Sequence, residues 1–317
     1  MNHARPLSRL APALFALLAL AMASRASAQA WVAPAGSGSV TLSVQTIRNT
    51  GHLLTDGVLL DDGKSVDASV SIDADYAFTD RFSMAVGIPF VFAKYIGPNP
   101  TPFAPQPVDV CRCWQSGWQD ISLVARYSIV NTRAFALTPS VAIGAPSHDY
   151  NYRGEAALGR DLKELRLAVD AGRRLDAISP RLSVQARYAY AIVEQVLEIP
   201  NNRSNASAEG AFQFTRRLSA HGGVAWQHTH GGLQLGTPPP LAAPGDLLVP
   251  GEVNTPEREA QHDRLLRDNN WHVSGGLAYS LPQMDLFFSY VEYVKGTDAH
   301  AGRAFTAGVS WPFEIGR

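Results

Sequence analysis

The chain has 317 residues, of which 46% are hydrophobic and 17% charged, and its formal net charge is −1. Binding to nucleic acid depends on lysine and arginine neutralising phosphates, so this balanced composition gives no basis for a nucleic-acid partner. Beyond the N-terminal segment, no window has the roughly twenty consecutive apolar residues of a membrane-spanning helix. If the mature chain enters a membrane, it must do so as a closed β-barrel.

Residues 1–28 have the three-part pattern of a secretory signal peptide. Arg5 and Arg9 precede the apolar run 14–23, and the small residues 26–28 follow it. The apolar run is too short to cross a hydrocarbon core of about 30 Å, which argues against a transmembrane anchor. We therefore predict cleavage after Ala28 and a single mature domain, residues 29–317. Because the removed segment holds three arginines and no acids, the formal charge would change from −1 to −4.

Residues 66–78, with the sequence VDASVSIDADYAF, alternate apolar and polar side chains with a period of two. Successive side chains of a β-strand point to opposite faces, so this alternation predicts a strand. Strands in general have about five to six residues. This segment has thirteen residues and is therefore about twice as long. A strand of this length fits a membrane barrel, with apolar residues toward lipid and Asp and Ser toward the lumen.

The same pattern recurs along the chain and predicts about twelve strands. Their lengths match the roughly nine to eleven residues that cross a membrane at a tilt, plus a margin. The expected positions are 39–49, 65–78, 82–94, 118–130, 134–144, 163–174, 181–193, 204–215, 218–230, 270–281, 284–295 and 302–313. Aromatic residues gather near the ends of these segments, where the interfacial girdles of a barrel belong.

The connections between these segments alternate between short and long. Outer-membrane barrels have this asymmetry, with short periplasmic turns and long external loops. A soluble β-sandwich is the alternative, but its strands are shorter and its turns lack this two-sided division. We therefore predict an all-β fold, a transmembrane antiparallel up-and-down β-barrel of about twelve strands. The short connections are 79–81, 131–133, 176–180, 216–217 and 282–283, and the long ones are 50–64, 95–117, 145–162, 194–203, 231–269 and the brief 296–301.

Charged residues fall on the polar face of several predicted strands. Mixed charges inside a narrow barrel are costly unless paired or hydrated, so we expect ion pairs and trapped water. One interpretation is that these residues only rigidify and hydrate the interior. The sharper one places the aspartates of 67–75 opposite the arginines of 126–187, as two walls of a selective constriction. The candidates for lining the lumen or setting selectivity are Asp67, Asp73, Asp75, Arg126, Glu164, Arg166, Asp170 and Arg187, and we expect Arg48, Lys94, Glu209, His221 and His272 on the same face.

The last predicted strand carries a polar-x-Gly-x-x-aromatic-x-hydrophobic pattern. This pattern resembles the C-terminal strand signal that is read by the outer-membrane assembly machinery, although four residues follow its final aromatic position. We predict that the assembly machinery is a partner. The residues of the pattern are Thr306, Gly308, Trp311 and Phe313.

The only two cysteines, Cys111 and Cys113, are separated by one residue. An extended pair at this spacing lies at the far edge of the Cα separation of about 4.4–6.8 Å that a disulfide allows. A metal site would need further ligands, and none is placed nearby in sequence. We favour an incidental or strained loop pair over a functional one, and we predict no metal site.

The longest connection contains a helix signal. Thr255 can serve as an N-cap, Pro256 suits the first helical position, and acids precede basic residues along the following turns. We predict a helix near 256–268. A solvated loop helix is the favoured interpretation, and a helix folded into the mouth as a constriction is the alternative.

Two clusters have residue types found in hydrolase sites. His228 and His230 lie near the end of one strand, and 147–149 reads Ser-His-Asp. Adjacent residues cannot form a catalytic triad among themselves, because the base must lie between two groups that approach from opposite sides. We therefore predict that the protein is not an enzyme.

The central section resembles the MetA-like family of outer-membrane barrels, which is associated with phenol meta-cleavage pathways. The resemblance is carried by SGWQDISLVARYSI at 116–129, AIGAPSHDY at 142–150 and ALGRDLKELRLAVDAGRRLD at 157–176. It implies a barrel that passes small molecules, hydrophobic or aromatic ones among them. No particular substrate follows, because fold-level analogy does not carry function.

These observations predict an outer-membrane β-barrel channel or transporter for passive uptake of small molecules in a Gram-negative bacterium. Its partners would be the lipid bilayer and a small-molecule solute, and it would need no cofactor. The first alternative is a structural or surface-interaction barrel with a closed lumen. An outer-membrane hydrolase is the second.

Overall fold

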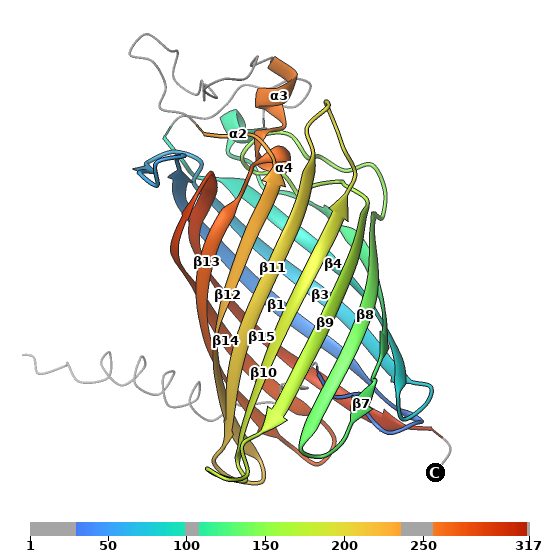
Figure 1. The fold of residues 1–317 in the computed structure, drawn as a ribbon. Helices are drawn as coiled ribbons and strands as arrows, with labels where there is room; N and C mark the ends of the chain where they lie inside the picture. Colours follow the sequence, from blue (N-terminus) through green and yellow to red (C-terminus); the bar gives the residue numbers. More distant parts are fainter. Residues whose placement is uncertain (1–29, 99–107, 236–255, 316–317) are drawn as a thin grey trace, which may run out of the picture.

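The computed structural model describes residues 30–98, 108–235 and 256–315. Within these ranges, twelve long antiparallel strands form one sheet that closes on itself, because the last strand pairs with the first (Figure 1). The other pairings follow the order of the strands along the chain. The wall consists of β1 Ser37–Leu53, β3 Ser65–Ala77, β4 Phe82–Tyr95, β6 Asp120–Tyr127, β8 Phe135–Pro146, β9 Glu164–Arg174, β10 Leu182–Val193, β11 Asn201–Gln213, β12 Leu218–Gly231, β13 Asn269–Ser280, β14 Asp285–Thr297 and β15 Ala299–Glu314.

The twelve predicted strands are confirmed, and most of their bounds differ from the prediction by few residues. The segment predicted at 118–130 corresponds to β6; β5 Gln115–Trp118 precedes it and shares only residue 118 with the prediction, and both strands pair with β4. β1 and β15 are longer than predicted, because their pairing continues beyond a register shift at Asn49 and Gly51. This extension carries the seam between the first and last strands into one mouth of the barrel.

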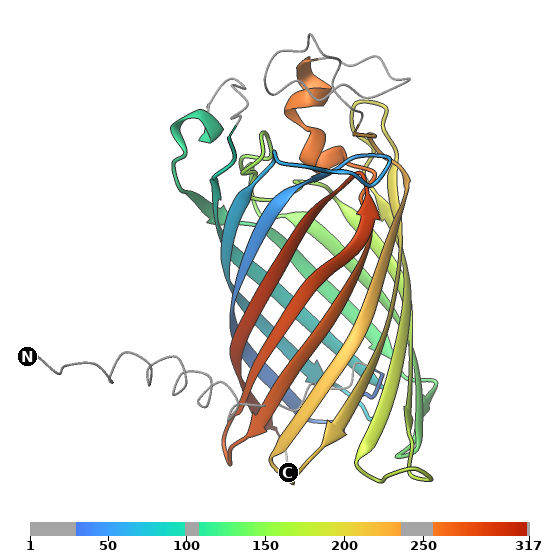
Figure 2. The ribbon, with the colours of Figure 1, turned by 90° about the vertical axis from the view of Figure 1, so that its left-hand side faces the viewer.

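The two ends of the barrel differ as the connection lengths predict (Figure 2). Short turns join the strands at one end, where the two-residue strand β7 Val130–Asn131 also lies. The long connections meet at the other end, which we call the external mouth (Figure 1). They contain β2 Leu59–Leu60, α2 Val108–Cys111, α3 Pro256–Ala260 and α4 His262–Leu265. No helix within the described ranges is long and apolar enough to cross a membrane.

The strands have an apolar outer face and a polar inner face. In β1 the outward residues Val40, Leu42 and Val44 are exposed, whereas the inward Thr41 and Gln45 donate hydrogen bonds to hydroxyls of β15. Outward aromatic side chains are also exposed near strand ends, as the girdle pattern predicts. They include Phe78, Tyr127, Trp271, Trp311 and Phe313, whereas Tyr188, predicted with them, lies in the middle of β10.

Arg48 and Lys94 correct the prediction of inward-facing charges. Arg48 continues the outward row of β1 and pairs with Val66, which in turn pairs with Lys94. All three residues therefore share the outer face. They lie toward the external ends of their strands, where an outward charged side chain can reach water beyond the apolar band.

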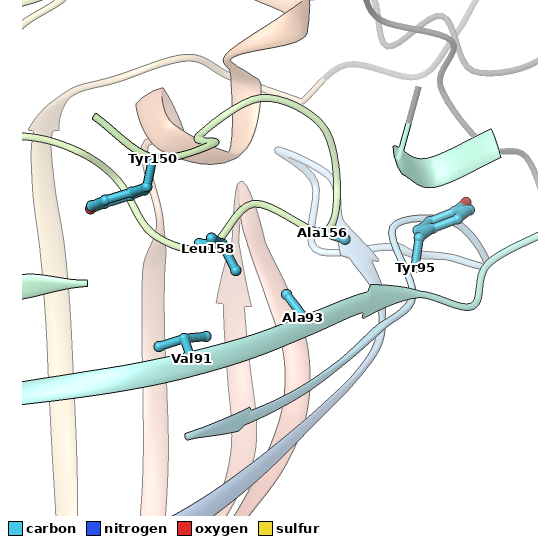
Figure 3. Packing of buried hydrophobic residues seen from close by; sticks show 6 residues of the cluster. All are labelled: Val91, Ala93, Tyr95, Tyr150, Ala156 and Leu158. Carbon is cyan, nitrogen blue, oxygen red and sulfur yellow. The ribbon is translucent and has the colours of Figure 1, made fainter. Parts of the chain in front are cut away.

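The buried apolar core lies at the external mouth. Tyr150, Ala156 and Leu158, from the connection 147–163, pack over Val91, Ala93 and Tyr95 on the inner face of β4 (Figure 3). A second cluster joins Leu265 of α4 to Leu233, at the start of the same connection, and to Ile199 of the connection between β10 and β11. The mouth is thus packed like a protein interior, in contrast to the polar lumen below it.

The segment before β1 lies at the opposite end of the barrel. The Trp31 indole N–H donates to the Thr132 carbonyl at 2.8 Å, and the Thr138 hydroxyl donates to the Ala30 carbonyl at 2.6 Å. Ala30 is fully buried. A Cβ on the inward-facing Gly172 would lie 2.3 Å from the Trp31 ring. This glycine therefore makes room for the tryptophan inside the lumen.

Cys111 and Cys113 form a disulfide in the loop after α2, and whether the pair has a function stays a prediction. Their Cα atoms are 5.2 Å apart, well within the usual range for a disulfide. The expected separation at the far edge of this range assumed an extended chain. Arg112 instead has φ +52° at the end of α2, so the backbone turns between the two cysteines.

The helix predicted near 256–268 is present as two shorter helices, α3 and α4, on either side of Gln261. The predicted N-cap, Thr255, lies outside the described residues. The favoured solvated helix was wrong for α4, because His262, Arg264 and Leu265 are buried. Packing against the mouth decides the position of this helix, and helix propensity alone does not report such packing.

Candidate functional site

The eight predicted lumen residues occupy inward-facing positions on four strands. In the strand order, β9 and β10 lie across the barrel from β3, whereas only β4 separates β6 from β3. Arg126 is therefore on the same side of the barrel as the β3 aspartates. Asp67, Asp73 and Asp75 are on β3, Arg126 is on β6, Glu164, Arg166 and Asp170 are on β9, and Arg187 is on β10.

Asp170 and Arg187 form the best-defined ion pair of the inner wall. They are direct cross-strand partners on β9 and β10, and Arg187 Nη1 lies 3.0 and 2.9 Å from the two carboxylate oxygens. The Asp170 side chain is only 3% exposed. Arg126 also interacts electrostatically with Asp170 from β6. One carboxylate therefore compensates charge from two neighbouring parts of the wall.

Glu164 joins two arginines near the external end of β9. It forms ion pairs with Arg166 and with Arg203 of β11. Arg203 was absent from the predicted set, although it is the more buried of the two arginines. Its position in the pattern of β11 places it on the inner face, so the alternation could have identified it.

The β3 aspartates are held by hydroxyl groups. The Ser65 hydroxyl donates to Asp67 at 3.1 Å, and the Ser39 hydroxyl donates to Asp75. Asp73 lies beside Gly87, where a Cβ would be 2.2 Å from its carboxylate. Among the described residues, none of these three carboxylates forms an ion pair. This side of the lumen thus carries acidic groups outside ion pairs, and Arg126 interacts with Asp75 only through longer-range electrostatics.

A cavity of about 440 Å³ lies along the inner wall between β10 and β13. It reaches upward to Asp268, which follows α4 and accepts hydrogen bonds from Gln227 and Arg160. Both charged and neutral polar side chains are available to a solute there. The polar lining includes Arg187, Asn205, Ser207, Gln227, Asp268, Asn270 and His272.

Five ionisable side chains meet in the external mouth, and we call them the mouth cluster: His52, Glu155, His262, Asp263 and His300. His52 and His300 are cross-strand partners at the seam between β1 and β15. Glu155 comes from the connection 147–163, and the other two residues belong to α4 (Figure 1). Their contacts are centred on the two carboxylates.

The Nε2 atoms of all three histidines face the Asp263 carboxylate. Their distances to Asp263 Oδ1 are 3.5 Å from His52, 3.1 Å from His262 and 3.3 Å from His300. Glu155 lies 3.4 Å from His52 and 3.3 Å from His262. The His52 and Glu155 side chains are 0% and 2% exposed. The cluster is therefore an arrangement of imidazoles around two acids that is fully buried at Glu155 and opens slightly toward His300, which is 22% exposed.

The loop members of the mouth cluster have strongly shifted pKa values. Burial alone would raise the pKa of the Asp263 carboxyl, but His300 and His262 hold it well below its usual value. Burial opposes the positive charge of His262, yet Asp263 and Glu155 raise its pKa well above the ordinary histidine value. Burial likewise opposes the charge of Glu155, whose pKa is lowered by His52 and His262. These groups stabilise one another as charged partners.

Asp109 of α2 positions the backbone that carries Glu155. It accepts hydrogen bonds from the N–H groups of Glu155 at 3.0 Å and Ala156 at 3.3 Å. Burial, together with the nearby Glu155 charge, raises the pKa of Asp109 to about 7. Gly154 has φ +81°, and a Cβ there would lie 2.6 Å from the Asp109 carboxylate. Glycine thus permits both the turn and the close approach.

Sequence reasoning did not identify the mouth cluster. Its members lie near positions 52, 155, 262 and 300, so no local spacing connects them. The closure of the barrel brings His52 beside His300, and the packing of two long connections adds the remaining residues. A signal in the sequence was that a histidine lies just after the first predicted strand, at His52, and another just before the last one, at His300.

Ser147 and His148 form a hydrogen bond of 2.9 Å on an exposed part of the mouth. This is a contact between adjacent residues, as expected from their sequence. It leaves the nucleophile and base without the opposed geometry that a triad requires. His230 interacts with the Ser204 hydroxyl on the outer face, at 2.8 Å.

Comparisons with known proteins relate the chain to solved barrels. No protein-family model and no curated protein matches it. The COG4313 outer membrane channel from Pseudomonas putida F1 is 14% identical, with 90% of this chain and 98% of that chain covered and a TM-score of 0.67. At this identity the likeness shows the shared fold of an outer-membrane barrel. The resemblance to the MetA-like family stays a prediction.

Two further solved barrels are similar at lower TM-scores. The translocator domain of the autotransporter NalP from Neisseria meningitidis is 10% identical, with coverage of 96% of this chain and 98% of that chain and a TM-score of 0.49. The NanC porin is 10% identical, with coverage of 85% and 98% and a TM-score of 0.47.

Proposed function

We propose that the chain forms a passive channel for small molecules in the bacterial outer membrane. The observation that carries the proposal is a closed barrel with an apolar outer face and a polar inner wall. Charged groups such as Asp170 and Arg187 line this wall, and a cavity of about 440 Å³ lies beside it. Passive movement along such a wall requires no cofactor and no covalent step.

Several predictions from the sequence form part of this proposal. Export through cleavage after Ala28 delivers residues 29–317, and the C-terminal strand pattern directs assembly in the outer membrane. The structure supports the second step by facing Trp311 and Phe313 outward, where a receptor for unfolded barrels can bind them. The similar barrel from Pseudomonas putida F1 carries the name of a channel, and we extend that role to this chain.

The solute class follows from the lumen and from the family resemblance. The packed mouth favours small solutes over oligomers, because apolar clusters join its loops to the wall. The resemblance to MetA-like barrels adds small aromatic compounds to the expected class. We propose that aromatic acids move past the mixed charges of the wall, with Arg187 and His272 lining the cavity of about 440 Å³.

Flux into lipid vesicles tests this function. The mature protein, refolded into vesicles, is expected to admit arabinose and benzoate faster than protein-free vesicles, and to exclude the tetrasaccharide stachyose. The measurement is vesicle swelling for the sugars and entrapped-dye fluorescence for benzoate. Correct folding is checked first by heat-dependent migration on a denaturing gel. A folded barrel that admits neither small solute contradicts the proposal and supports the closed, structural alternative.

The inner charges supply a second test of the same function. Asp73→Asn removes an acidic charge that no cation pairs with directly, whereas Arg126→Gln removes a basic charge beside Asp170. We expect the two substitutions to shift the cation-to-anion permeability ratio in opposite directions. Equal selectivity in both variants and the wild type would exclude these residues from the conducting path.

A further inference from the structure

We propose that the mouth cluster is a binding site for a divalent transition-metal ion, which pins the two long connections into the external mouth. The ligands are His52, Glu155, Asp263 and His300. Each offers one ligand atom, and these atoms all lie within 4.8 Å of one another. The inference is independent of whether the barrel conducts solutes.

The separations between ligand atoms fit a metal better than direct hydrogen bonds. With bonds of about 2.0–2.2 Å to a tetrahedral zinc ion, ligand atoms lie roughly 3.4 Å apart. The observed separations are 3.4 Å between His52 and Glu155, and 3.5 and 3.3 Å from Asp263 to His52 and His300. These exceed the usual N–H···O distance of about 2.9–3.0 Å. One central ion fits these three separations, and the remaining ligand pairs, which lie within 4.8 Å of one another, would draw together around it.

Burial adds a second argument. The Glu155 side chain is 2% exposed, and its Oε2 atom has no hydrogen-bond partner among the described residues, with its ion-pair contact to His52 Nε2 at 3.4 Å. A buried carboxylate oxygen in that position is costly, whereas a cation would satisfy it. Two carboxylates also match the charge of a divalent ion when the ligating imidazoles are neutral.

The chemistry of the ligands selects the class of ion. Two imidazoles and two carboxylates suit zinc and similar first-row divalent ions, whereas calcium and magnesium favour oxygen ligands throughout. His262 contacts both carboxylates beside the proposed ion, and its Nε2 atom lies 3.3 Å from the Glu155 carboxylate. We place it as a neighbour that orients the acids.

The surroundings hold the ligands in place. The His52 ring packs against Gly63, where a Cβ would lie 2.2 Å from the ring and φ is +64°. Asp109 fixes the backbone of Glu155, as described above. Arg264 in α4 donates to the Asp161 carbonyl at 2.6 Å and lies over the Tyr152 ring at 4.1 Å. An ion in the cluster would therefore link the β1–β15 seam, the connection 147–163 and α4.

Metal binding can be measured directly on the mature protein refolded in detergent and freed of metal with a chelator. Isothermal titration with Zn²⁺ is expected to show one tight site per chain, confirmed by elemental analysis after gel filtration. Co²⁺ in the same position should give the intense visible absorption of a four-coordinate site. A wild-type protein that binds neither ion at one per chain would show an ion-pair network only and overturn the proposal.

Matched variants locate the site. His52→Gln and Asp263→Asn should each weaken Zn²⁺ binding by more than about 100-fold, beyond the effect typical of residues that only support a ligand. His228→Gln is the control, because His228 lies away from the mouth cluster and stacks on Trp226. Wild-type affinity in both cluster variants, or loss only in the control, would assign the metal elsewhere. If either cluster variant fails to fold, the Co²⁺ spectrum of the wild type still decides the coordination.

Hydrogen exchange tests the second half of the proposal. Zn²⁺ should slow amide exchange in residues 147–163 and 256–265 at least tenfold, while leaving the mid-barrel strands unchanged. Tight binding without this protection would establish the metal site and refute its role in pinning the loops. The flux assay reads out the channel separately, so failure of one inference does not imply failure of the other.

Discussion

The lumen and the external mouth use ionisable residues in different ways. In the lumen, Asp170 pairs with its cross-strand neighbour Arg187, and both belong to regular strands. In the mouth, His52 and Glu155 approach from a strand and a long connection, and apolar clusters surround them. Regular pairing maintains a polar wall, whereas loop packing assembles a compact site. The two regions should therefore respond differently to substitution.

The largest expected effect is in the lumen. Asp170→Asn removes the carboxylate that faces both Arg187 and Arg126, so we expect a loss of about 3 kcal/mol in the free energy of unfolding. Urea titration of the barrel in lipid vesicles measures it. The double variant Asp170→Asn/Arg187→Gln should recover part of the loss, because the Arg187 charge is removed together with Asp170 and only Arg126 remains beside the neutral amide. An unchanged unfolding midpoint in the single variant would show that water already compensates Arg187.

A smaller and local effect is expected in the mouth. Leu265→Ala removes a fully buried side chain that packs with Leu233 and Ile199. We expect about 2 kcal/mol less stability for the docked α4, without an equal change for the barrel. Hydrogen exchange of residues 256–265 measures the local opening, and the urea midpoint measures the wall. Equal changes in both would show that the mouth and wall unfold as one unit.

The smallest of the three effects concerns one hydrogen bond. The Tyr95 hydroxyl donates to Asp62 at 2.7 Å, and both residues are buried at the mouth. Tyr95→Phe keeps the ring in its apolar cluster but removes this donor, so we expect a loss of about 1–2 kcal/mol. Local hydrogen exchange near residues 60–65 is the measurement. Phe92→Tyr on the outer face of the same strand is a control that should leave this exchange unchanged.

The wall could be predicted from the sequence because the alternation of apolar and polar residues within each strand indicates which side chains face lipid and which face the lumen. The alternation in 66–78 and the division into short and long connections were enough to predict the closed barrel. The alternation also placed Asp170 and Arg187 on the inner face of their strands, and the pairing of the two strands then brought them into contact. The predicted inward orientation of Arg48 and Lys94 was wrong, because the outward-facing positions of their strands become polar beyond the apolar band.

The mouth could not be predicted in the same way, because its contacts join residues far apart in the chain. His52 meets His300 only after the barrel closes, and Glu155 meets Asp263 only after two connections fold inward. The helix signal near residue 256 was correct in position, but it contained no information about what α4 packs against. Cys111 and Cys113 likewise depended on the backbone turn at Arg112.

Single-channel conductance in a planar bilayer tests most directly whether the polar wall bounds a path. The mature wild-type barrel is predicted to give discrete conductance steps, and Asp73→Asn and Arg126→Gln to move the reversal potential in opposite directions under a salt gradient. Folded, inserted wild-type protein that leaves the bilayer sealed would contradict the channel and favour a barrel whose packed mouth closes its lumen.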